Sequence, residues 1–422
     1  MLKNKLAKNA FSLLLLKGFE YLLPLLTVPY LVRILGNEKF GEMSYAIAIS
    51  YFFVMVTNYG FDLTATRQIS IHKEDMEKVK SIFSSVLTVK ILLMLISFGL
   101  LFTALSVIPQ LQGNNVVYYI AFFNVIGNAL FPIWLFQGIE KMEYITGINM
   151  FAKISTTLLI FIIVKEPGDY VLATLLQSIP FVICAVVSFI IISRKLTIAY
   201  VFPDVEEIVY CFKDGWNVFT SAFMSFILTS GGILILGVFA NKEVVGIYSA
   251  IEKLAKAIIN LFTPITQALF PYISEKFGVS YNSGKQAVFK FGKWIIILAA
   301  FISMVMMIGA KWILLIFYGD NYVQYNLVVQ LFAIWLLTSI FNNIIGIQYL
   351  VASGKSNLYS KSFLFSTIIT LTLFLVLTPN MHMYGILIGI NVGELILTVV
   401  MLFYAIKNDR IFNTNHLSHS KE

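Results

Sequence analysis

The chain has 422 residues, of which 59% are hydrophobic and only 12% are charged. Soluble domains carry roughly 25% charged residues, so this composition excludes a soluble protein, although the length alone would suggest about three domains. The net charge of +8 comes from basic residues dispersed among short connections, which form no basic surface for nucleic acid. Cys184 and Cys211 offer neither a disulfide framework nor metal-site spacing. We expect a membrane protein without cofactor, metal or nucleic-acid partner.

Twelve segments are long and apolar enough to cross a bilayer, which needs about 20 residues at a rise of about 1.5 Å each. The first follows a basic amino terminus and is too long for a signal-peptide core, so it is interpreted as an uncleaved span. The expected spans are 9–35, 41–63, 82–107, 116–139, 148–164, 170–192, 215–239, 247–273, 292–318, 326–351, 358–378 and 382–406. The pattern therefore predicts an all-α polytopic membrane protein.

The distribution of lysine and arginine predicts the orientation. Twenty of these residues lie in the termini and connections of one side, whereas the other side has only Lys39, Lys165 and Lys242. Cytoplasmic connections are enriched in Lys and Arg, so we expect both termini in the cytoplasm. All connections are short, which leaves no room for an extramembrane catalytic domain.

Two helix starts are expected beside the membrane. Pro203 and Asp204 predict an amphipathic interfacial helix over 204–217, and Ser283 with Gln286 three residues later predicts the cap before the ninth span. The expected domains are an N-terminal six-helix bundle (1–195), a cytoplasmic connecting segment with this helix (196–214), and a C-terminal six-helix bundle with a short tail (215–422).

The two halves resemble each other. Residues 37–46 read NEKFGEMSYA and residues 241–250 read NKEVVGIYSA, about half the chain apart. Internal symmetry of two six-span halves is typical of transporters whose substrate path lies between the repeats. A chance similarity is the alternative.

Charged residues within the spans are the candidate site residues. A charge at bilayer depth costs roughly 3 kcal/mol on insertion scales, so it is expected to face a partner or a water-filled space. Lys17 and Glu20 are three residues apart on one face of the first span. They are predicted to line a substrate path, with a structural ion pair as the alternative.

Further polar residues occur deep in later spans. Glu252, Lys256 and Asn260 recur at four-residue spacing and make a polar stripe on the eighth span, predicted to bind substrate. Lys90 and Glu394 lie in the third and twelfth spans. Each of these two either lines the path or pairs between helices.

Three other charged residues receive different interpretations. Lys153 lies near a span end, where a long side chain is expected to reach the headgroups. Asp62 and Arg67, at the cytoplasmic end of the second span, are predicted to make a gate or structural contact.

The segment Pro29–Ser70 contains a specific series of motifs. It includes PYL at 29–31, LG at 35–36, YGF at 59–61 and ATR at 65–67, and QYLVASGK follows at 348–355. These motifs and the twelve-span layout resemble the polysaccharide-export family that contains the Wzx-type O-antigen flippases.

This resemblance implies the fold of the multidrug/oligosaccharidyl-lipid/polysaccharide exporter superfamily, with twelve helices in two six-helix bundles, related by pseudo-symmetry, around a central cavity. It implies a flippase of a bacterial inner membrane that moves an undecaprenyl-diphosphate-linked oligosaccharide to the periplasmic leaflet, in O-antigen or similar polysaccharide biosynthesis. Expected further partners are a coupling proton or sodium ion, a polysaccharide polymerase and a chain-length regulator.

Other functions make different demands on the sequence. A drug or cation antiporter of the same superfamily predicts a cavity dominated by carboxylates, whereas lysines here match or exceed carboxylates within the spans. A membrane glycan polymerase usually has a large periplasmic loop, which this chain lacks. A scaffold or channel does not explain the internal repeat. The sequence thus favours transport of an anionic substrate without enzymatic chemistry.

Overall fold

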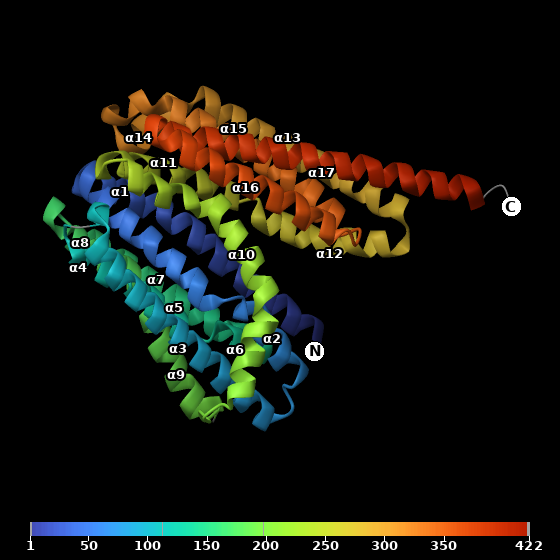
Figure 1. The fold of residues 1–422 in the computed structure, drawn as a ribbon, viewed down its shortest axis with the longest axis horizontal. Coiled ribbons are helices and arrows are strands. Elements are labelled where there is room, and N and C mark those ends of the chain that lie inside the picture. Colours follow the sequence, from blue (N-terminus) through green and yellow to red (C-terminus); the bar gives the residue numbers. More distant parts are fainter. Residues whose placement is uncertain (1, 112, 197, 420–422) are drawn as a thin grey trace. The chain divides into compact units, whose positions relative to one another are not determined.

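The computed structural model describes the backbone at residues 2–111, 113–196 and 198–419, and the side chains at residues 23–111, 113–196 and 198–407. All regular elements in these ranges are helical (Figure 1). By their internal contacts, these residues form two compact units, Met1–Ser249 and Ala250–Glu422.

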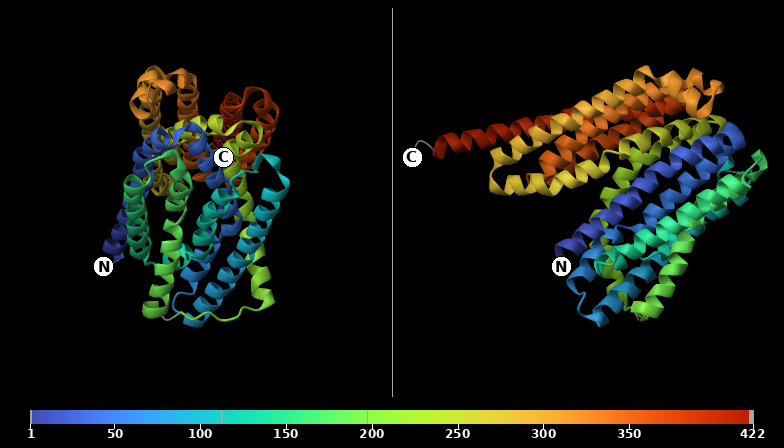
Figure 2. Two further views of the ribbon diagram at one scale, coloured as in Figure 1. Left: turned by 90° about the vertical axis from the view of Figure 1, so that its left-hand side faces the viewer. Right: turned by 180° about the vertical axis from the view of Figure 1, so that it is seen from behind.

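The first unit is a bundle of long helices and shorter helical pieces. Its elements are α1 (Leu2–Asn58), α2 (Phe61–Ile71), α3 (Met76–Val107), α4 (Asn115–Ala121), α5 (Phe123–Leu130), α6 (Ile133–Gly138), α7 (Met142–Ile163), α8 (Tyr170–Ser178), α9 (Pro180–Ile191), α10 (Val205–Phe239) and the start of α11 (Lys242–Asn260). Helix α1 lies beside α7, as both views in Figure 2 show. Two short segments, the 3₁₀ turn η2 (Pro167–Asp169) and the π turn η3 (Ile192–Leu196), flank α8 and α9.

Helix α1 contains the first expected span and most of the second, which ends in α2. Its backbone leaves the helical region at Gly36, where φ is 73° and ψ is 166°. A positive φ is readily adopted by glycine because it lacks a Cβ, so Gly36 allows the chain to turn between the two spans. Asp75 then caps α3, its carboxylate accepting a hydrogen bond of 3.2 Å from the Lys78 amide.

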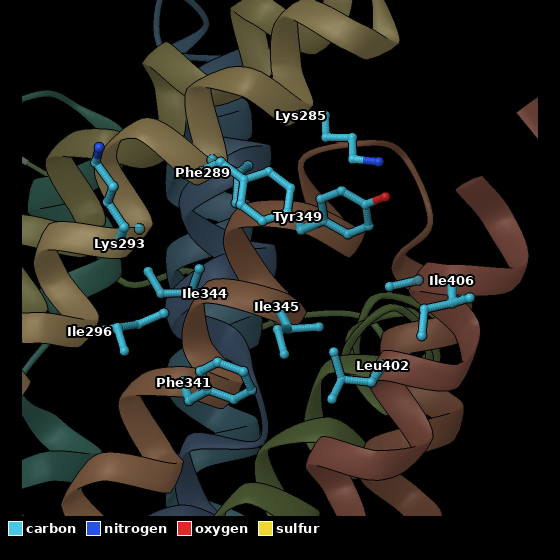
Figure 3. Close-up of a pocket in the computed structure, with 13 residues that line it drawn as sticks. Lys285, Phe289, Lys293, Ile296, Phe341, Ile344, Ile345, Tyr349, Leu402 and Ile406 are labelled. Atoms are coloured by element: carbon cyan, nitrogen blue, oxygen red, sulfur yellow. The ribbon is translucent and has the colours of Figure 1, made fainter. Parts of the chain in front are cut away.

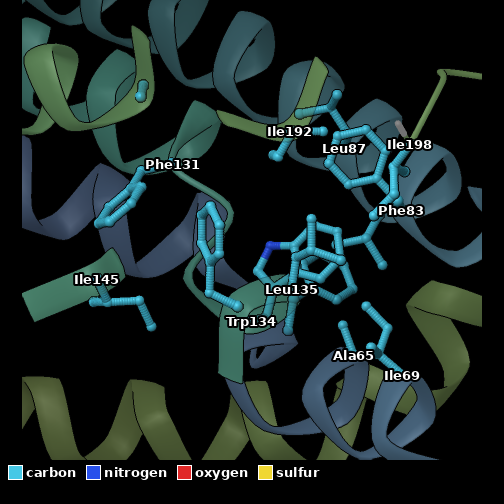
Figure 4. Packing of buried hydrophobic residues seen from close by; sticks show 14 of the residues in the cluster. Ala65, Ile69, Phe83, Leu87, Phe131, Trp134, Leu135, Ile145, Ile192 and Ile198 are labelled. Carbon is cyan, nitrogen blue, oxygen red and sulfur yellow. The ribbon is translucent and has the colours of Figure 1, made fainter. Parts of the chain in front are cut away.

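A dense apolar cluster connects α2, α3 and α6 within this unit (Figure 4). Trp134 of α6 packs beside Phe83 of α3, with ring centroids 5.9 Å apart, and both are buried. Leu135 is fully buried in the same cluster, and Ile69 of α2 packs closely against Gly138. These contacts join the short helices α2 and α6 to the long α3.

The second unit contains the remainder of α11 and six further α-helices. These are α12 (Thr263–Val279), α13 (Tyr281–Ile308), α14 (Ala310–Tyr318), α15 (Asn326–Asn343), α16 (Ser356–Met381) and α17 (Met383–His419), with the 3₁₀ segment η4 (Asp320–Tyr325) and the π-helical segment η5 (Ile344–Val351).

Helices α16 and α17 form a close antiparallel pair (Figure 1). Gly385, Gly389 and Gly393 recur every fourth residue on α17. A Cβ on Gly389 would crowd the ring of Phe374, and one on Gly393 would overlap the Thr370 hydroxyl. Within lipid, helices associate through such close packing of small residues because the lipid tails are as apolar as the side chains.

Ten segments of the described chain are long and apolar enough to cross a membrane, so the protein is a multi-pass membrane protein. One of them, Leu23–Ile71, contains part of the first expected span and all of the second. The region expected as the eighth span is not among them; there α11 carries five charged residues and gives way to α12 after Asn260.

Two local predictions need adjustment. Helix α13 begins at Tyr281, and its cap is Ser280, whose hydroxyl accepts from the Ser283 amide at 3.1 Å. The cap predicted at Ser283 was therefore wrong by one turn. The predicted helix after Asp204 exists, but it continues without a break to Phe239 as α10. The domain limits 1–195, 196–214 and 215–422 stay a prediction.

Candidate functional site

Lys17 and Glu20, the first predicted pair, lie outside the residues whose side chains are described. Their helical backbone belongs to α1. Their place in a substrate path stays a prediction.

The predicted stripe on α11 contains an ion pair. Lys256 Nζ lies 3.1 Å from Glu252 Oε1, one helical turn away. The Glu252 side chain is 7% exposed, whereas that of Lys256 is 29% exposed. Asn260 lies one turn further on and is half-buried. The ammonium is thus the accessible end of the pair and the one able to meet an anionic ligand.

Lys90 is enclosed within the first unit, at 1% exposure. Its ammonium donates to Asn58 Oδ1 at 3.0 Å and to the Asn128 carbonyl at 3.1 Å. Asn128 in turn donates to Asn124 Oδ1 at 2.9 Å, and Asn124 donates to the Ser50 hydroxyl at 3.1 Å. This network joins α1, α3 and α5, and it corresponds to the interhelical alternative for Lys90.

Glu394 also pairs between helices, in the second unit. Its carboxylate accepts from Trp335 Nε1 at 3.2 Å and from Asn342 Nδ2 at 2.5 Å. The Thr398 hydroxyl donates to Asn342 Oδ1 at 2.6 Å, which orients the amide. The network joins α15 to α17 through neutral donors. Neutral donors satisfy the carboxylate oxygens without cancelling the charge.

Arg67 contacts α10 within the first unit. Its Nη2 lies 2.8 Å from Asp214 Oδ1, and Gln68 Nε2 donates to the same carboxylate at 2.9 Å. The Arg67 side chain is 61% exposed, so the pair contributes about 0–1 kcal/mol to stability. The Asp62 carbonyl accepts from the Thr66 hydroxyl at 2.6 Å, which stabilises the first turn of α2.

A polar pocket of about 180 Å³ lies between α1, α7 and the α8–α9 region. Lys153 lines it with Tyr51, Thr157 and Gln177, and its Nζ lies 5.1 Å from the centre of the Phe181 ring. Sequence reasoning placed Lys153 at the headgroups and missed this pocket. The threonines three and four residues after Lys153 were an available signal, because they share its helical face.

Lys242 is the first residue of α11 and lies outside the spanning segments. Its ammonium donates to the Tyr118 hydroxyl and the Gln110 carbonyl, both at 3.3 Å, and lies 4.5 Å from the centre of the Tyr45 ring. Burial lowers the pKa of Lys242, while the nearby Glu42 carboxylate opposes this shift.

No group of three or more metal-ligating side chains occurs in the described part of the chain, and Cys184 and Cys211 are buried thiols. The arrangement offers ammonium, amide, hydroxyl and aromatic groups that can bind polar ligands.

Solved structures with a similar fold are membrane transport proteins. The lipid II flippase MurJ, in an inward closed conformation, superposes with a TM-score of 0.70, at 14% identity over 93% of this chain and 86% of MurJ. An inward-facing multidrug resistance MATE family transporter of the MOP superfamily superposes with a TM-score of 0.69, at 12% identity over 96% and 99% of the two chains. The protein is thus an all-helical polytopic membrane protein that shares its fold with these transport proteins, as the sequence predicted.

Sequence comparison narrows this class. The model of the family described as "Polysaccharide biosynthesis protein" matches residues 6–277, which is more than half of the chain, and the chain belongs to this family. Two proteins named "Putative O-antigen transporter" are similar over almost their whole length. The one from Escherichia coli (strain K12) is 29% identical over 97% of this chain and 98% of its own. The one from Shigella dysenteriae is 28% identical over 94% and 98%.

Proposed function

We propose that this protein is a flippase that moves a lipid-linked oligosaccharide from the cytoplasmic to the outer leaflet, as one step of polysaccharide biosynthesis. The observation that carries the proposal is the near full-length similarity to two O-antigen transporters. The fold shared with a lipid II flippase supports it. Such a protein catalyses no covalent reaction.

Each unit has polar groups that suit the binding of a diphosphate with attached sugars. A diphosphate with attached sugars does not cross hydrocarbon unaided, so it needs a polar surface with positive charge while its lipid tail stays in the membrane. Lysine suits a phosphate as a compact point charge. Lys153, with neighbouring hydroxyl, amide and aromatic groups, offers this combination in the first unit, and Lys256 is the accessible cation of the α11 stripe.

The finer features of the function are also proposals. The substrate is an undecaprenyl-diphosphate-linked repeat unit, of O-antigen or a similar polysaccharide, and transport proceeds by alternating access of two six-helix bundles. Lys17, Glu20 and the Glu252–Lys256–Asn260 stripe line its path. The protein lies in a bacterial inner membrane with both termini in the cytoplasm. A proton or sodium ion drives transport, and a polymerase and a chain-length regulator act on the product.

Deletion of the protein tests the function. We expect surface glycan to disappear while lipid-linked units accumulate on the cytoplasmic leaflet, and re-expression of the intact chain to restore display. Lectin labelling of intact cells measures the surface glycan. Lectin labelling of inverted vesicles, followed by lipid extraction, measures the lipid-linked units on the cytoplasmic leaflet. Continued display with only an altered chain length would instead indicate a polymerase or length regulator. Normal display with increased drug sensitivity would indicate a multidrug antiporter.

A further inference from the structure

The second unit contains a narrow apolar slot that the proposed translocation path does not use. It lies between α13, η5 and α17 and has a volume of about 270 Å³ (Figure 3). Its walls are mostly branched aliphatic and aromatic, and include Phe289, Ile296, Phe341, Ile344, Ile345 and Leu402. Lys285, Lys293 and the Tyr349 phenol are the polar side chains of the lining. This composition suits a hydrocarbon chain that carries a polar end.

The π-helical segment η5 shapes one wall of the slot. The helix that begins as α15 changes to π geometry at Ile344, and such widened turns are frequent at functional sites. Ile344 packs directly over Gly292 of α13, where a Cβ would force it to move. On α13, the lining residues recur at positions 285, 288, 289, 292, 293 and 296, which share one helical face.

A polar cavity adjoins the slot along the first turns of α13. It is an open hollow along one face of α13, lined by Asn282, Lys285, Gln286, Phe289, Lys290 and Lys293. Lys285, Phe289 and Lys293 line both spaces, so the two are adjacent. Three of the six described lining residues are cationic, and the other three are uncharged.

The position of this cavity matches the headgroup level of a membrane. α13 starts with this lysine-rich segment and continues as a long apolar helix. Trp294 is 64% exposed and Phe289 is 64% exposed, as is typical of aromatic residues at the interface between water and lipid. By the predicted orientation, this end of α13 faces the cytoplasm.

We propose that the slot and the adjoining cavity together bind the lipid carrier of the substrate, a polyprenyl diphosphate. The branched isoprenoid tail enters the apolar slot, and the diphosphate contacts Lys285, Lys290 and Lys293. Three ammonium groups match a diphosphate, which carries more than one negative charge, better than the single charge of a common phospholipid. The site would hold the carrier on the cytoplasmic side before its sugars enter the path. This inference rests on the proposed function for the identity of the lipid.

Binding of the sugar-free carrier tests the site without transport. The purified full-length protein is titrated with undecaprenyl diphosphate, and complexes are quantified by native mass spectrometry. Two competitors each lack one feature of the carrier: phosphatidylglycerol has acyl chains and a single phosphate, and inorganic diphosphate has no tail. We expect each competitor to bind at least about tenfold more weakly than undecaprenyl diphosphate, because each lacks either the full diphosphate contact or the contact of the tail with the slot. Equal binding of phosphatidylglycerol would overturn the assignment to a diphosphate lipid, and equal binding of inorganic diphosphate would overturn the role of the slot.

Removing the three charges tests the cavity. The triple variant Lys285→Gln, Lys290→Gln and Lys293→Gln should bind the carrier about 100-fold more weakly, because each lysine near an anionic headgroup contributes about a factor of five. The matched control is Lys276→Gln, Lys355→Gln and Lys361→Gln, which removes the same charge from positions that line neither space. Unchanged affinity in the first variant, or equal loss in the control, would overturn the proposal.

Filling the slot gives a second, independent measurement. Ala405→Trp places a large ring in the slot and should reduce carrier binding to the level of inorganic diphosphate, with inorganic diphosphate binding unchanged.

Crosslinking of the wild-type chain gives a test that needs no variant. A photoactivatable polyprenyl diphosphate should crosslink to peptides of 285–296 and 341–349, and crosslinks confined to other helices would contradict the site. Carrier binding can fail while deletion still stops glycan display, so this proposal and the proposed function can be rejected separately.

Discussion

Gly41 and Gly246 lie against each other where α1 meets α11, and the contact is reciprocal. A Cβ on Gly41 would overlap the Lys242 carbonyl, and one on Gly246 would overlap the Asn37 carbonyl. In each case the carbonyl belongs to the residue four positions before the other glycine. Gly41 and Gly246 thus exchange matching contacts, one position out of register with the match of 37–46 on 241–250, in which Gly41 pairs with Val245. Such self-complementary contacts are typical of two-fold related elements.

This close approach predicts a specific sensitivity to side-chain volume. Gly41→Val and Gly246→Val should each lower stability by about 1–3 kcal/mol, because the added methyl groups have no space in a packed contact. The melting temperature of the purified protein measures the effect. The control is Gly99→Val on α3, where a Cβ would meet no atom within 4 Å. An equal loss in the control would show that valine in an apolar helix, rather than the contact, is responsible.

The Glu252–Lys256 pair gives the sharpest test of the substrate path. If Lys256 meets the diphosphate, Lys256→Ala should abolish glycan display, and Lys256→Arg should keep part of it because the positive charge is retained. Loss of the cation also removes the Lys256 ion pair from the buried Glu252 carboxylate, which lowers protein abundance.

The double variant Glu252→Ala with Lys256→Ala separates the two effects. It removes the buried charge, so abundance should recover, whereas display should stay absent. Immunoblotting of membranes and surface glycan staining provide the two readouts. Full display at normal abundance would remove Lys256 from the substrate site.

Lys90 is expected to act structurally, because it is enclosed and bonded to Asn58 and Asn128. Lys90→Met preserves much of the side-chain volume but leaves both oxygens without this donor. A buried unsatisfied polar group costs about 1–3 kcal/mol, so the melting temperature should fall while the protein that folds still supports display. Lys311→Met, at an exposed position of α14, is the control and should change neither quantity. Lost display at a normal melting temperature would instead place Lys90 in transport.

The predicted orientation can be tested by cysteine labelling. Both native cysteines are buried, and they are first replaced by alanine. Asn114→Cys, before α4, should react with a membrane-impermeant maleimide in intact spheroplasts. Ser283→Cys, in the first turn of α13, should react only after the membrane is opened. Labelling of Ser283→Cys from outside would show that the orientation is the reverse of the predicted one and that the lysine cavity of α13 lies on the outer side.

The sequence by itself determined the features that depend on local interactions. A helix in lipid satisfies its own backbone hydrogen bonds, so the length and apolarity of each segment predicted the helical membrane fold. The Glu252–Lys256 pair also followed from spacing, because residues four apart on a helix are neighbours. The close packing of Gly385, Gly389 and Gly393 against α16 came instead from the tertiary structure.

Only the tertiary structure decided which polar groups meet across helices. Lys90 and Glu394 looked alike in sequence as single charges in apolar spans, and their amide partners come from helices distant along the chain. The sequence indicated only that basic residues such as Lys285, Lys290 and Lys293 lie on the cytoplasmic side of the membrane. The slot beside them requires the π turn at Ile344 and the position of α17, neither of which is encoded by a local pattern. Side chains distant in sequence share a cavity only through packing, and packing is a property of the whole unit.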